Sequence, residues 1–487
     1  MPDVRSSIVF YLNDQRLELA DVAPDRTLLD FLRLERVLRG TKEGCAEGDC
    51  GACTVLVGRL DATGLTYESV NACIRLMGSL DGCHVLTIEH LSGEGGVLHP
   101  VQQAMVDQHG SQCGFCTPGI VMSLYAMWLD NPVPQRADIE TALQGNLCRC
   151  TGYAPILRAA EAISAYGAAD SDALRVASVD MASKLVALQD GRRVDVRSGG
   201  GRFLVPVDTD DLASILVEQP EATLVAGSTD VGLWVTKFLR PISPVVFIGH
   251  LMQDVSVGDS SIRLGAGLSY GRARKTIAFH LPQLLPLWDR IGGAQVRNMG
   301  TIGGNIANGS PIGDTPPPLI ALGAELMLRR GSSRRTVRLE DYFLSYGRQD
   351  RAPGEFIESI TVPLPHAADR LAAYKVSKRR DEDISSVLGA FRLRVEGGAV
   401  TDAVIAYGGM AATPRRARAV EAALVGRPWT IATVEAALAA YPDDFEPLSD
   451  WRASANYRML VARNLLVRFF YEHDGSSAQS RGQAVLS

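Results

Sequence analysis

Four cysteines near the N-terminus have the spacing of ligands to an iron–sulfur cluster. Cys45, Cys50 and Cys53 form a C-x4-C-x2-C pattern within T-K-E-G-C-A-E-G-D-C-G-A-C, and Cys73 follows after a strand-like run. This is the plant-type spacing for a [2Fe–2S] cluster. Four thiolates must converge on one small cluster, and a tight loop can supply three of them. The spacing therefore predicts a [2Fe–2S] site in this loop.

Three glycines among these cysteines suit the same site. Gly44, Gly48 and Gly51 allow positive φ and let backbone amides approach the sulfur atoms, where such donors stabilise the negative charge of a cluster. The alternatives are a zinc site or unrelated structural cysteines. Zinc sites usually present paired C-x2-C knuckles. A single glycine-rich C-x4-C-x2-C loop therefore favours iron and sulfide.

A second group of cysteines follows. Cys113 and Cys116 form C-G-F-C, and Cys148 and Cys150 form C-R-C. Helical patterns flank both pairs, so helix ends can present four thiolates to one site. Spacing favours an iron–sulfur cluster but leaves a structural zinc ion open, since four thiolates bind either. Cys83, in a strand-like run, fits a buried free thiol.

Two glycine-rich turns lie further along the chain and could bind phosphate. In the first, Gly227, Ser228 and Thr229 follow a buried strand pattern and precede a helix. Such a turn offers backbone amides and hydroxyl groups to an anion. The second is the run G-T-I-G-G-N-I-A-N-G-S beginning at Gly300. Each turn alone is weak evidence, but two of them suit a pyrophosphate.

Composition narrows the class of protein. The chain has 487 residues, 46% hydrophobic and 21% charged, with a net charge of -6. A soluble globular protein of roughly three or four domains is expected, without an electrostatic case for binding nucleic acid or acidic membranes. No 18-residue apolar run or signal-peptide core is found. All nine cysteines precede residue 151, which predicts a metal-bearing N-terminal third in a reducing compartment, the cytoplasm.

The cysteines are positioned by two small domains. A hairpin at 7–20, a helix capped by Asp25, the cysteine loop and further strands predict a β-grasp ferredoxin-like domain. Helices beginning near Thr117 and Pro155, with one at about 136–144 between them, predict a domain like a four-helix bundle.

The rest of the chain changes to alternating strands and helices. We expect an α/β domain that carries the two glycine-rich turns and then an α+β C-terminal domain in which strands precede helices, so the fold class is multidomain α+β. The expected boundaries are 1–88 and 89–168 for the two cysteine domains, 169–195 for a linker with some helix, 196–366 for the α/β domain, 370–474 for the C-terminal domain and 475–487 for a disordered tail.

The motifs together resemble one family. The order is the C-x4-C-x2-C loop, C-G-F-C-T-P-G with N-L-C-R-C-T-G-Y, L-V-A-G-S-T-D, T-I-G-G-N with S-P-I-G-D, and K-R-R-D-E-D-I. Over nearly the whole chain this order is similar to the xanthine dehydrogenase family of molybdenum hydroxylases, in the form of a small subunit that carries the iron–sulfur and flavin domains. The family resemblance identifies the domain at 196–366 as FAD-binding. The paired C-G-F-C-T-P-G and L-C-R-C-T-G-Y segments are highly specific and favour a second [2Fe–2S] cluster.

The resemblance implies roles for individual residues. The first four cysteines would hold the cluster nearer the flavin, and the second four the cluster nearer molybdenum. Ile291 stands where animal relatives place an aromatic residue against the flavin, so this chain departs from the family there. The charge reversal from Arg379 to Asp383, which alone would suit a solvated turn, matches a segment beside the flavin that governs access of NAD. The implied FAD contacts are Leu224, Val225, Ala226, Gly227, Ser228, Thr229, Asp230 and Val231 at the first turn, Thr301, Gly304, Asn305 and Asn308 at the second, and Asp314, Ile357 and Lys375.

The resemblance also implies a function. The chain would be the electron-transfer subunit of an NAD-dependent xanthine dehydrogenase, without a molybdenum-type catalytic site of its own. A partner subunit with the molybdenum cofactor would oxidise hypoxanthine and xanthine to urate. Electrons would pass through two [2Fe–2S] clusters to FAD and then to NAD+, in a complex with two copies of each subunit.

Other functions stay open. Related hydroxylases of aldehydes, carbon monoxide or N-heterocycles share the same cofactors, although the fusion of domains in this order favours the xanthine type. A flavoprotein that passes electrons to oxygen is a further possibility. From a different class, a zinc-bearing scaffold without redox function would contain neither iron nor flavin.

Overall fold

A computed structural model describes residues 3–61 and 63–474 of the chain. The chain divides into two compact units. The first comprises Met1–Leu251, Ser269–Gly271 and Gly292–Thr301, and the second comprises Met252–Leu268, Arg272–Ile291 and Ile302–Ser487. The tail expected at 475–487 lies outside the described residues. No helix in the described ranges combines the length and apolarity needed to cross a bilayer.

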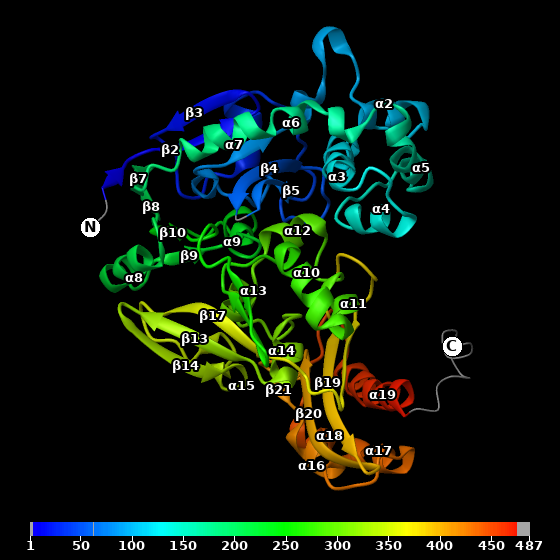
Figure 1. Ribbon diagram of the computed structural model, residues 1–487. Helices are drawn as coiled ribbons and strands as arrows, with labels where there is room; N and C mark the ends of the chain where they lie inside the picture. The colour runs from blue at the N-terminus through cyan, green and yellow to red at the C-terminus, as the bar shows by residue number, and fades with distance from the viewer. Residues whose placement is uncertain (1–2, 62, 475–487) are drawn as a thin grey trace. The chain divides into compact units, whose positions relative to one another are not determined.

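The first unit contains two five-stranded sheets and a group of helices (Figure 1). Its strands are β1 (Val4–Arg5), β2 (Ile8–Leu12), β3 (Gln15–Leu19), β4 (Thr54–Asp61), β5 (Gly64–Asn71), β6 (His84–Leu86), β7 (Arg193–Ser198), β8 (Gly201–Val205), β9 (Thr223–Val225) and β10 (Val245–Phe247). Its helices are α1 (Leu28–Asp30), α2 (Pro100–Asp107), α3 (Thr117–Asp130), α4 (Arg136–Ala142), α5 (Ala154–Ala162), α6 (Ala173–Val176), α7 (Ser178–Val186), α8 (Thr209–Glu218), α9 (Val231–Thr236) and α12 (Ala294–Met299).

The N-terminal sheet has the strand order β3-β2-β6-β4-β5. The expected hairpin is present: β2 pairs antiparallel with β3 around Asn13, whose φ is 52°. The helix after it differs from expectation. It is capped by the Thr27 side chain rather than by Asp25 and continues as a π-helical turn over Phe31–Glu35. Leu28, Phe31 and other apolar residues of this segment close the core beneath the sheet.

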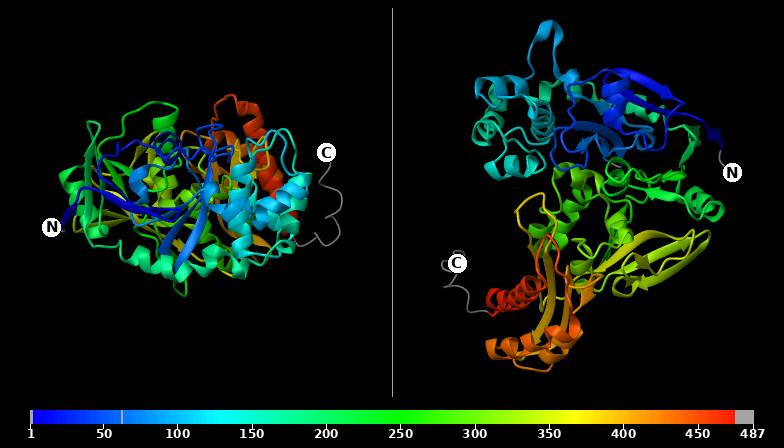
Figure 2. Two further views of the ribbon diagram at one scale, coloured as in Figure 1. Left: turned by 90° about the horizontal axis from the view of Figure 1, so that it is seen from above. Right: turned by 180° about the vertical axis from the view of Figure 1, so that it is seen from behind.

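The helices α2, α3, α4 and α5 gather beside this sheet in both views of the first unit (Figures 1 and 2). Helix α3 begins at Thr117, as expected, and its residues Ile120, Leu124 and Trp128 are all at most 1% exposed. Its N-cap position is Cys116, so the proline of the T-P-G run falls inside the first turn, where a missing N–H costs nothing. The N-cap of this helix is thus a cysteine.

Residues 169–195, expected to be a linker, contain α6, which Asp172 ties to the helical group, and α7, which packs against β4 and β5. Asp172 accepts hydrogen bonds of 2.8 Å from Tyr125 Oη and from His99 Nε2. His99 Nδ1 accepts from the amide of Val101, so Nε2 carries the proton. Burial raises the pKa of Asp172, but the bonds from His99 and Tyr125 outweigh it and the pKa is lowered overall.

The second sheet of the first unit has the order β1-β7-β8-β10-β9. Strand β1, from the very start of the chain, pairs in parallel with β7, with Val4 opposite Arg193. Strand β10 lies between β8 and β9 and is parallel to both. The N-terminal strand thus belongs to the sheet that carries β9 and the first glycine-rich turn.

The second unit contains a five-stranded sheet of order β11-β12-β17-β13-β14 and a four-stranded sheet of order β18-β19-β20-β21. Its strands are β11 (Val255–Val257), β12 (Ser261–Gly265), β13 (Glu325–Arg330), β14 (Ser333–Arg338), β15 (Phe343–Ser345), β16 (Arg348–Gln349), β17 (Phe356–Pro363), β18 (Asp369–Val376), β19 (Val387–Glu396), β20 (Ala399–Gly408) and β21 (Arg415–Arg416). Its helices are α10 (Tyr270–His280, whose first two residues belong to the first unit), α11 (Leu285–Trp288), α13 (Ile302–Asn308), α14 (Pro316–Leu322), α15 (Leu339–Tyr342), α16 (Arg418–Leu424), α17 (Ile431–Ala437), α18 (Tyr441–Asp444) and α19 (Ala455–His473).

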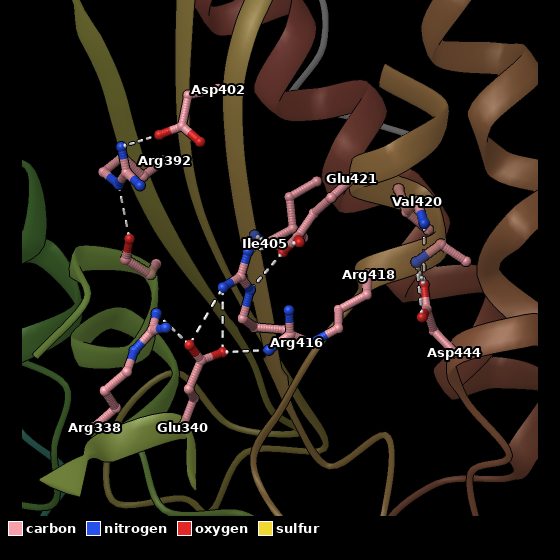
Figure 3. Close-up of polar contacts among 12 residues, drawn as sticks. Arg338, Glu340, Arg392, Asp402, Ile405, Arg416, Arg418, Val420, Glu421 and Asp444 are labelled. Atoms are coloured by element: carbon pink, nitrogen blue, oxygen red, sulfur yellow. Dashed lines mark hydrogen bonds and ion pairs between the residues drawn. The ribbon is translucent and has the colours of Figure 1, made fainter. Parts of the chain in front are cut away.

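A buried ion-pair network joins three elements of this unit (Figure 3). Arg416 lies 3.2 Å from Glu340 Oε2 and 2.8 Å from Glu421 Oε2, and all three side chains are at most 14% exposed. Glu421 also accepts the amide of Ile405 at 2.8 Å. Burial raises the pKa of Glu421 despite the adjacent guanidinium. Arg416 therefore offsets the cost of two buried carboxylates.

Replacing Arg416 with methionine should lower the free energy of unfolding of this unit by about 3 kcal/mol, because it leaves buried carboxylates short of a partner. Arg418→Met is the matched control, since Arg418 also contacts Glu340 but is 64% exposed, and it should cost at most about 1 kcal/mol. Urea unfolding measures both. The Arg416→Met deficit should shrink as the pH falls through the raised pKa of Glu421, because a neutral acid needs no cation. Equal unfolding midpoints for the two variants would contradict this account.

Candidate functional site

The first cysteine group surrounds one end of the β4–β5 hairpin. Cys53 directly precedes β4, Cys73 lies two residues after β5, and Thr54 pairs with Asn71 across the hairpin. This register brings the two sulfur atoms to 3.3 Å. Asn71 also donates its side-chain amide to Cys53 Sγ at 3.8 Å. A hairpin end thus supplies one pair of thiols.

The loop before β4 supplies the other pair, Cys45 and Cys50. Backbone amides of Glu47, Asp49 and Cys50 point at Cys45 Sγ from 3.5, 3.4 and 3.4 Å. Hydrogen bonds from the thiols of Cys50 and Cys73, together with these amides, hold the pKa of Cys45 well below its ordinary value. The loop is therefore shaped to stabilise negative charge on sulfur.

Glycine serves this loop in two ways. Gly48 and Gly51 have φ of 80° and 69°, as expected. The expectation of positive φ was wrong for Gly44; Ala46 instead takes φ of 54°. Gly44 is needed for space, because a Cβ there would lie 2.7 Å from Cys50 Sγ.

The second cysteine group lies where three helices end. Cys116 caps α3, Cys113 precedes it by three residues, and Cys148 and Cys150 lie between α4 and α5. The thiols interact as Cys113 with Cys150 and Cys116 with Cys148. The amide of Phe115 and then the Cys150 thiol lower the pKa of Cys113. Burial, and then the Cys148 thiol, raise the pKa of Cys116 to about 12.

The thiols of the second group interact in two pairs, as two irons of a four-cysteine [2Fe–2S] cluster would require. In the first group Cys53 contacts Cys73, and Cys45 contacts both Cys50 and Cys73. Within the described ranges, no group of three or more His, Cys, Asp or Glu side chains is arranged to hold one metal ion. Cys83 belongs to neither group, being buried with its sulfur 3.7 Å from the carbonyl oxygen of Asp81.

The first glycine-rich turn joins β9 to α9. Gly227 is packed so closely that a Cβ would lie 1.8 Å from the carbonyl oxygen of Met299 and 3.1 Å from Gly300 Cα, so this turn abuts the start of the second one. Ser228 has φ of 62° and is 5% exposed. Its Oγ has no hydrogen-bond partner among the described residues. A buried hydroxyl without a partner among the described residues, in a glycine-rich turn before a helix, fits a bound phosphate.

The second unit contains a cluster of hydrogen-bonded polar side chains around Asp314, which follows α13. Lys375 Nζ, on β18, donates to Asp314 Oδ2 at 2.5 Å and to the carbonyl oxygen of Arg290 at 3.1 Å. The other carboxylate oxygen of Asp314 accepts from Ser385 Oγ at 2.5 Å. Asn305 Oδ1 accepts from Thr315 Oγ1 at 2.6 Å. Two residues expected to contact FAD, Asp314 and Lys375, are therefore partners of each other.

The expected FAD contacts are divided between the units. The run Leu224–Val231 and Thr301 belong to the first unit, and the others belong to the second. Among the expected FAD contacts of the second unit, Ile357 and Ile291 are 6% and 7% exposed, consistent with packing, whereas Gly304 and Asn308 are exposed.

Sequence reasoning missed Arg290. Its guanidinium donates to the Lys375 carbonyl, the Arg380 carbonyl and Ser377 Oγ. The charge-reversal loop contributes internal bonds, with the Arg379 amide on Asp383 at 2.8 Å.

Sequence reasoning also missed helix α12. Its residues Gln295 and Arg297 are 1% and 4% exposed although polar. The helix has six residues and no apolar period, so periodicity could not reveal it. The available signal was the run Q-V-R-N directly before a glycine-rich turn.

Family models match four consecutive parts of the chain. They are described as a 2Fe-2S iron-sulfur cluster binding domain (residues 10–77), a [2Fe-2S] binding domain (87–161), a FAD binding domain in molybdopterin dehydrogenase (197–365) and a CO dehydrogenase flavoprotein C-terminal domain (372–473). The expected fold class, with two iron–sulfur domains, a FAD-binding domain and a C-terminal domain, is confirmed.

Curated relatives carry the name xanthine dehydrogenase. The xanthine dehydrogenase of Emericella nidulans is 33% identical over 96% of this chain and 38% of its own length. The xanthine dehydrogenase/oxidase of Felis catus is 33% identical over 83% of this chain and 34% of its own length. The chain thus spans between a third and two fifths of these relatives.

Solved structures of carbon monoxide dehydrogenase are similar to part of the chain. One from Hydrogenophaga pseudoflava has a TM-score of 0.52 and 28% identity, covering 55% of this chain and 94% of that one. One from Oligotropha carboxidovorans has a TM-score of 0.51 and 27% identity, covering 54% and 94%. From the four matched domains and these relatives, the chain belongs to the molybdenum hydroxylase family, as a chain that joins the family's iron–sulfur and FAD-binding domains.

Proposed function

We propose that the chain is the electron-transfer subunit of an NAD-dependent xanthine dehydrogenase. The observation that carries this proposal is the junction of the two cysteine groups in one unit. The amide of Leu147, next to Cys148, donates to the carbonyl oxygen of Cys50 at 3.0 Å. One hydrogen bond thus links the backbone of a first-group cysteine to the residue directly before a second-group cysteine.

In this proposal the metal ligands are Cys45, Cys50, Cys53 and Cys73 for one cluster, and Cys113, Cys116, Cys148 and Cys150 for the other. The clusters supply one-electron steps, and FAD converts these into transfer of a hydride to NAD+. The chain's residues hold these groups and keep water from part of the first cluster, whereas Cys113 and Cys150 of the second group are exposed. Amides around Cys45 favour negative sulfur, and burial of Cys53 and Cys73, at 1% and 2% exposed, excludes solvent.

The FAD contacts are proposed as the run Leu224–Val231 with Thr301 in the first unit, and in the second unit the residues Ile291, Gly304, Asn305, Asn308, Asp314, Ile357 and Lys375. Ser228 Oγ would donate to a phosphate oxygen, the partner that it lacks. Lys375 would remain paired with Asp314 and keep that carboxylate fixed. The proposed boundaries are 1–88 and 89–168 for the iron–sulfur domains, 169–195 for the segment between, 196–366 for the FAD-binding domain and 370–474 for the C-terminal domain.

Substrate and partner are also proposals. The names of the curated relatives support oxidation of xanthine, and oxidation of hypoxanthine is proposed from the family resemblance. From the same resemblance we place the molybdenum cofactor on a partner subunit, in a complex with two copies of each chain. Unoxidised thiols in two groups suit the cytoplasm.

A second candidate is supported by the structural comparison. The similarity to carbon monoxide dehydrogenase, at 28% identity over 55% of this chain, allows the same electron-transfer role beside a hydroxylase partner with a different substrate. Assaying the assembled complex with xanthine, aldehydes, N-heterocycles and carbon monoxide, with NAD+ or oxygen as acceptor, separates these candidates. Turnover of any substrate other than purines in preference to xanthine would replace the first proposal by the second.

The cofactor content tests the electron-transfer role itself. The purified chain should contain about four irons and one FAD, with broad absorbance from roughly 400 to 600 nm. Iron, acid-labile sulfide and flavin assays measure this directly. Zinc in place of iron, with no flavin, would identify a scaffold and remove the redox function.

The cysteine assignment is tested by Cys148→Ala. The variant should lose about two irons and one of two electron paramagnetic resonance signals, because three thiolates do not complete a four-thiolate cluster, while FAD stays bound. Cys83→Ala is the matched control, since Cys83 is also buried but lies outside both groups; it should keep all iron. Full iron in Cys148→Ala, or purine-driven NAD+ reduction in its assembled complex, would overturn the assignment.

The flavin assignment is tested by Ser228→Ala. Alanine meets the same strain at positive φ as serine, so the change removes only the hydroxyl. The loss of one hydrogen bond should raise the Kd for FAD about two- to tenfold and leave the stability of the flavin-free protein unchanged. Ser214→Ala, on the exposed side of α8, is the control. Flavin fluorescence titration gives the Kd, and equal values for both variants would exclude Ser228 from the site.

A further inference from the structure

Gln295, on helix α12, bonds to segments that carry both cysteine groups. Its Nε2 lies 3.1 Å from Thr54 Oγ1, 3.0 Å from Ser123 Oγ and 2.9 Å from Asn146 Oδ1. Thr54 follows Cys53, Asn146 precedes Cys148 by two residues, and Ser123 lies on the helix that Cys116 caps. One buried amide therefore bonds to three parts of the chain that carry these thiols.

The hydroxyl groups around Gln295 fix which way its amide points. Thr54 donates its own hydrogen to the Gly51 carbonyl at 2.7 Å, and Ser123 donates to Asn146 Oδ1 at 2.7 Å. Both hydroxyls therefore present only lone pairs to Gln295, and Asn146 Oδ1 is an acceptor as well. The Gln295 nitrogen must face them, with two hydrogens shared among three acceptors.

The other end of the amide is closely confined. Gln295 Oε1 is buried and has no hydrogen-bond partner among the described residues. A Cβ on Gly145 would lie 2.0 Å from this oxygen, so the loop backbone packs directly against it. A native protein rarely leaves a buried carbonyl oxygen unpaired without a functional reason.

The same helix touches the first group again and then leads into the second glycine-rich turn. Asn298 Nδ2 donates to the carbonyl oxygen of Ser69 at 2.9 Å. The amide of Asn71 lies 3.3 Å from Met299 Sδ, and the Asn71 side chain reaches Cys53 Sγ. The carbonyl oxygen of Met299 is the atom that excludes a side chain at Gly227. Helix α12 is thus packed between the cysteine loops and the first glycine-rich turn.

We infer that Gln295 is a positioning residue for electron transfer: it holds the two cysteine loops at a fixed separation and so sets the coupling between the centres that they bind. The inference rests on the proposed function and adds a residue that ligates nothing. Hydrogen bonds of this kind, one step removed from the ligands, tune metal centres. Without the amide, the loops would keep their thiols and the Leu147–Cys50 bond but lose the shared donor that ties Thr54, Ser123 and Asn146 together.

The test uses the full chain with its cofactors bound. Gln295→Met keeps the length of the side chain and removes the donor. Gln103→Met is the matched control, because Gln103 is a partly exposed glutamine on α2 whose side chain bonds to Asp107 in the same helix. Iron content is measured first. Electron paramagnetic resonance of the dithionite-reduced protein then reports each centre and the magnetic splitting between them, and potentiometric titration reports their potentials.

We expect Gln295→Met to keep its iron and both paramagnetic resonance signals. The magnetic splitting between the centres should change, and both reduction potentials should shift. Electron equilibration between the centres should slow about tenfold in freeze-quench samples. Splitting, potentials and rate equal to those of the control would overturn the inference. If Gln295→Met loses iron, Ser123→Ala decides, because it keeps the Gln295 amide and removes only the Ser123 hydroxyl, which accepts from Gln295 and donates to Asn146. A smaller change in the same direction supports the inference, and no change overturns it. A wild-type chain without iron would overturn the proposed function and this inference with it, whereas an iron-replete Gln295→Met protein with unchanged spectra would overturn the inference alone.

Discussion

The structure of the first unit depends on the close approach of backbone to backbone around Gly51. The carbonyl oxygen of Gly51 accepts from the Thr54 amide, from Thr54 Oγ1 and from Asn146 Nδ2, at 3.1, 2.7 and 3.2 Å. A Cβ on Gly119 would lie 2.1 Å from this oxygen, and a Cβ on Gly51 would lie 2.0 Å from the Gly145 carbonyl oxygen. Three chain segments therefore meet at distances that only glycine permits.

This constraint explains why the two cysteine groups behave as one piece of structure. A side chain at Gly51 or Gly119 would meet backbone oxygen and force the loops apart, and one at Gly145 would displace the Gln295 amide, so the bonds across the junction would weaken together. Interiors pack densely and transmit such shifts. The polar groups at the junction are nearly all paired, which makes the arrangement specific as well as close.

Much of this could be predicted from the sequence, for identifiable physical reasons. The two cysteine groups stand out by their spacing, because C-x4-C-x2-C is typical of ligands to a [2Fe–2S] cluster, and the hairpin at Asn13 and the helix α3 follow from local periodicity. The cap at Asp25 was wrong because Thr27 competes successfully for the same role and a π-helical turn follows. Gly44 was assigned to the wrong cause, since its need for space comes from Cys50 across the loop.

What could not be predicted depends on contacts between residues distant in sequence. Gln295 is 149 residues from Asn146 and 241 from Thr54, and nothing in a single sequence relates them. The same holds for Arg416 and Glu340, 76 residues apart. The division of the expected FAD contacts between two units was also invisible, because the glycine-rich turns look alike wherever the chain places them.

The segment between the iron–sulfur and FAD-binding domains has a consequence for how such chains can be divided or joined during evolution. Because Asp172 is bonded to His99 and Tyr125, α6 is tied to the helical domain, and α7 packs against β4 and β5. A break that leaves both products folded must therefore fall after α7, near Gly191. Even then β1 pairs in parallel with β7, so the N-terminal product would carry the strand that extends the sheet of the C-terminal product. In two separate polypeptides, the pairing of β1 with β7 would be a contact between subunits. Fusion makes the same contact internal, so that its two strands are always present at a fixed effective concentration.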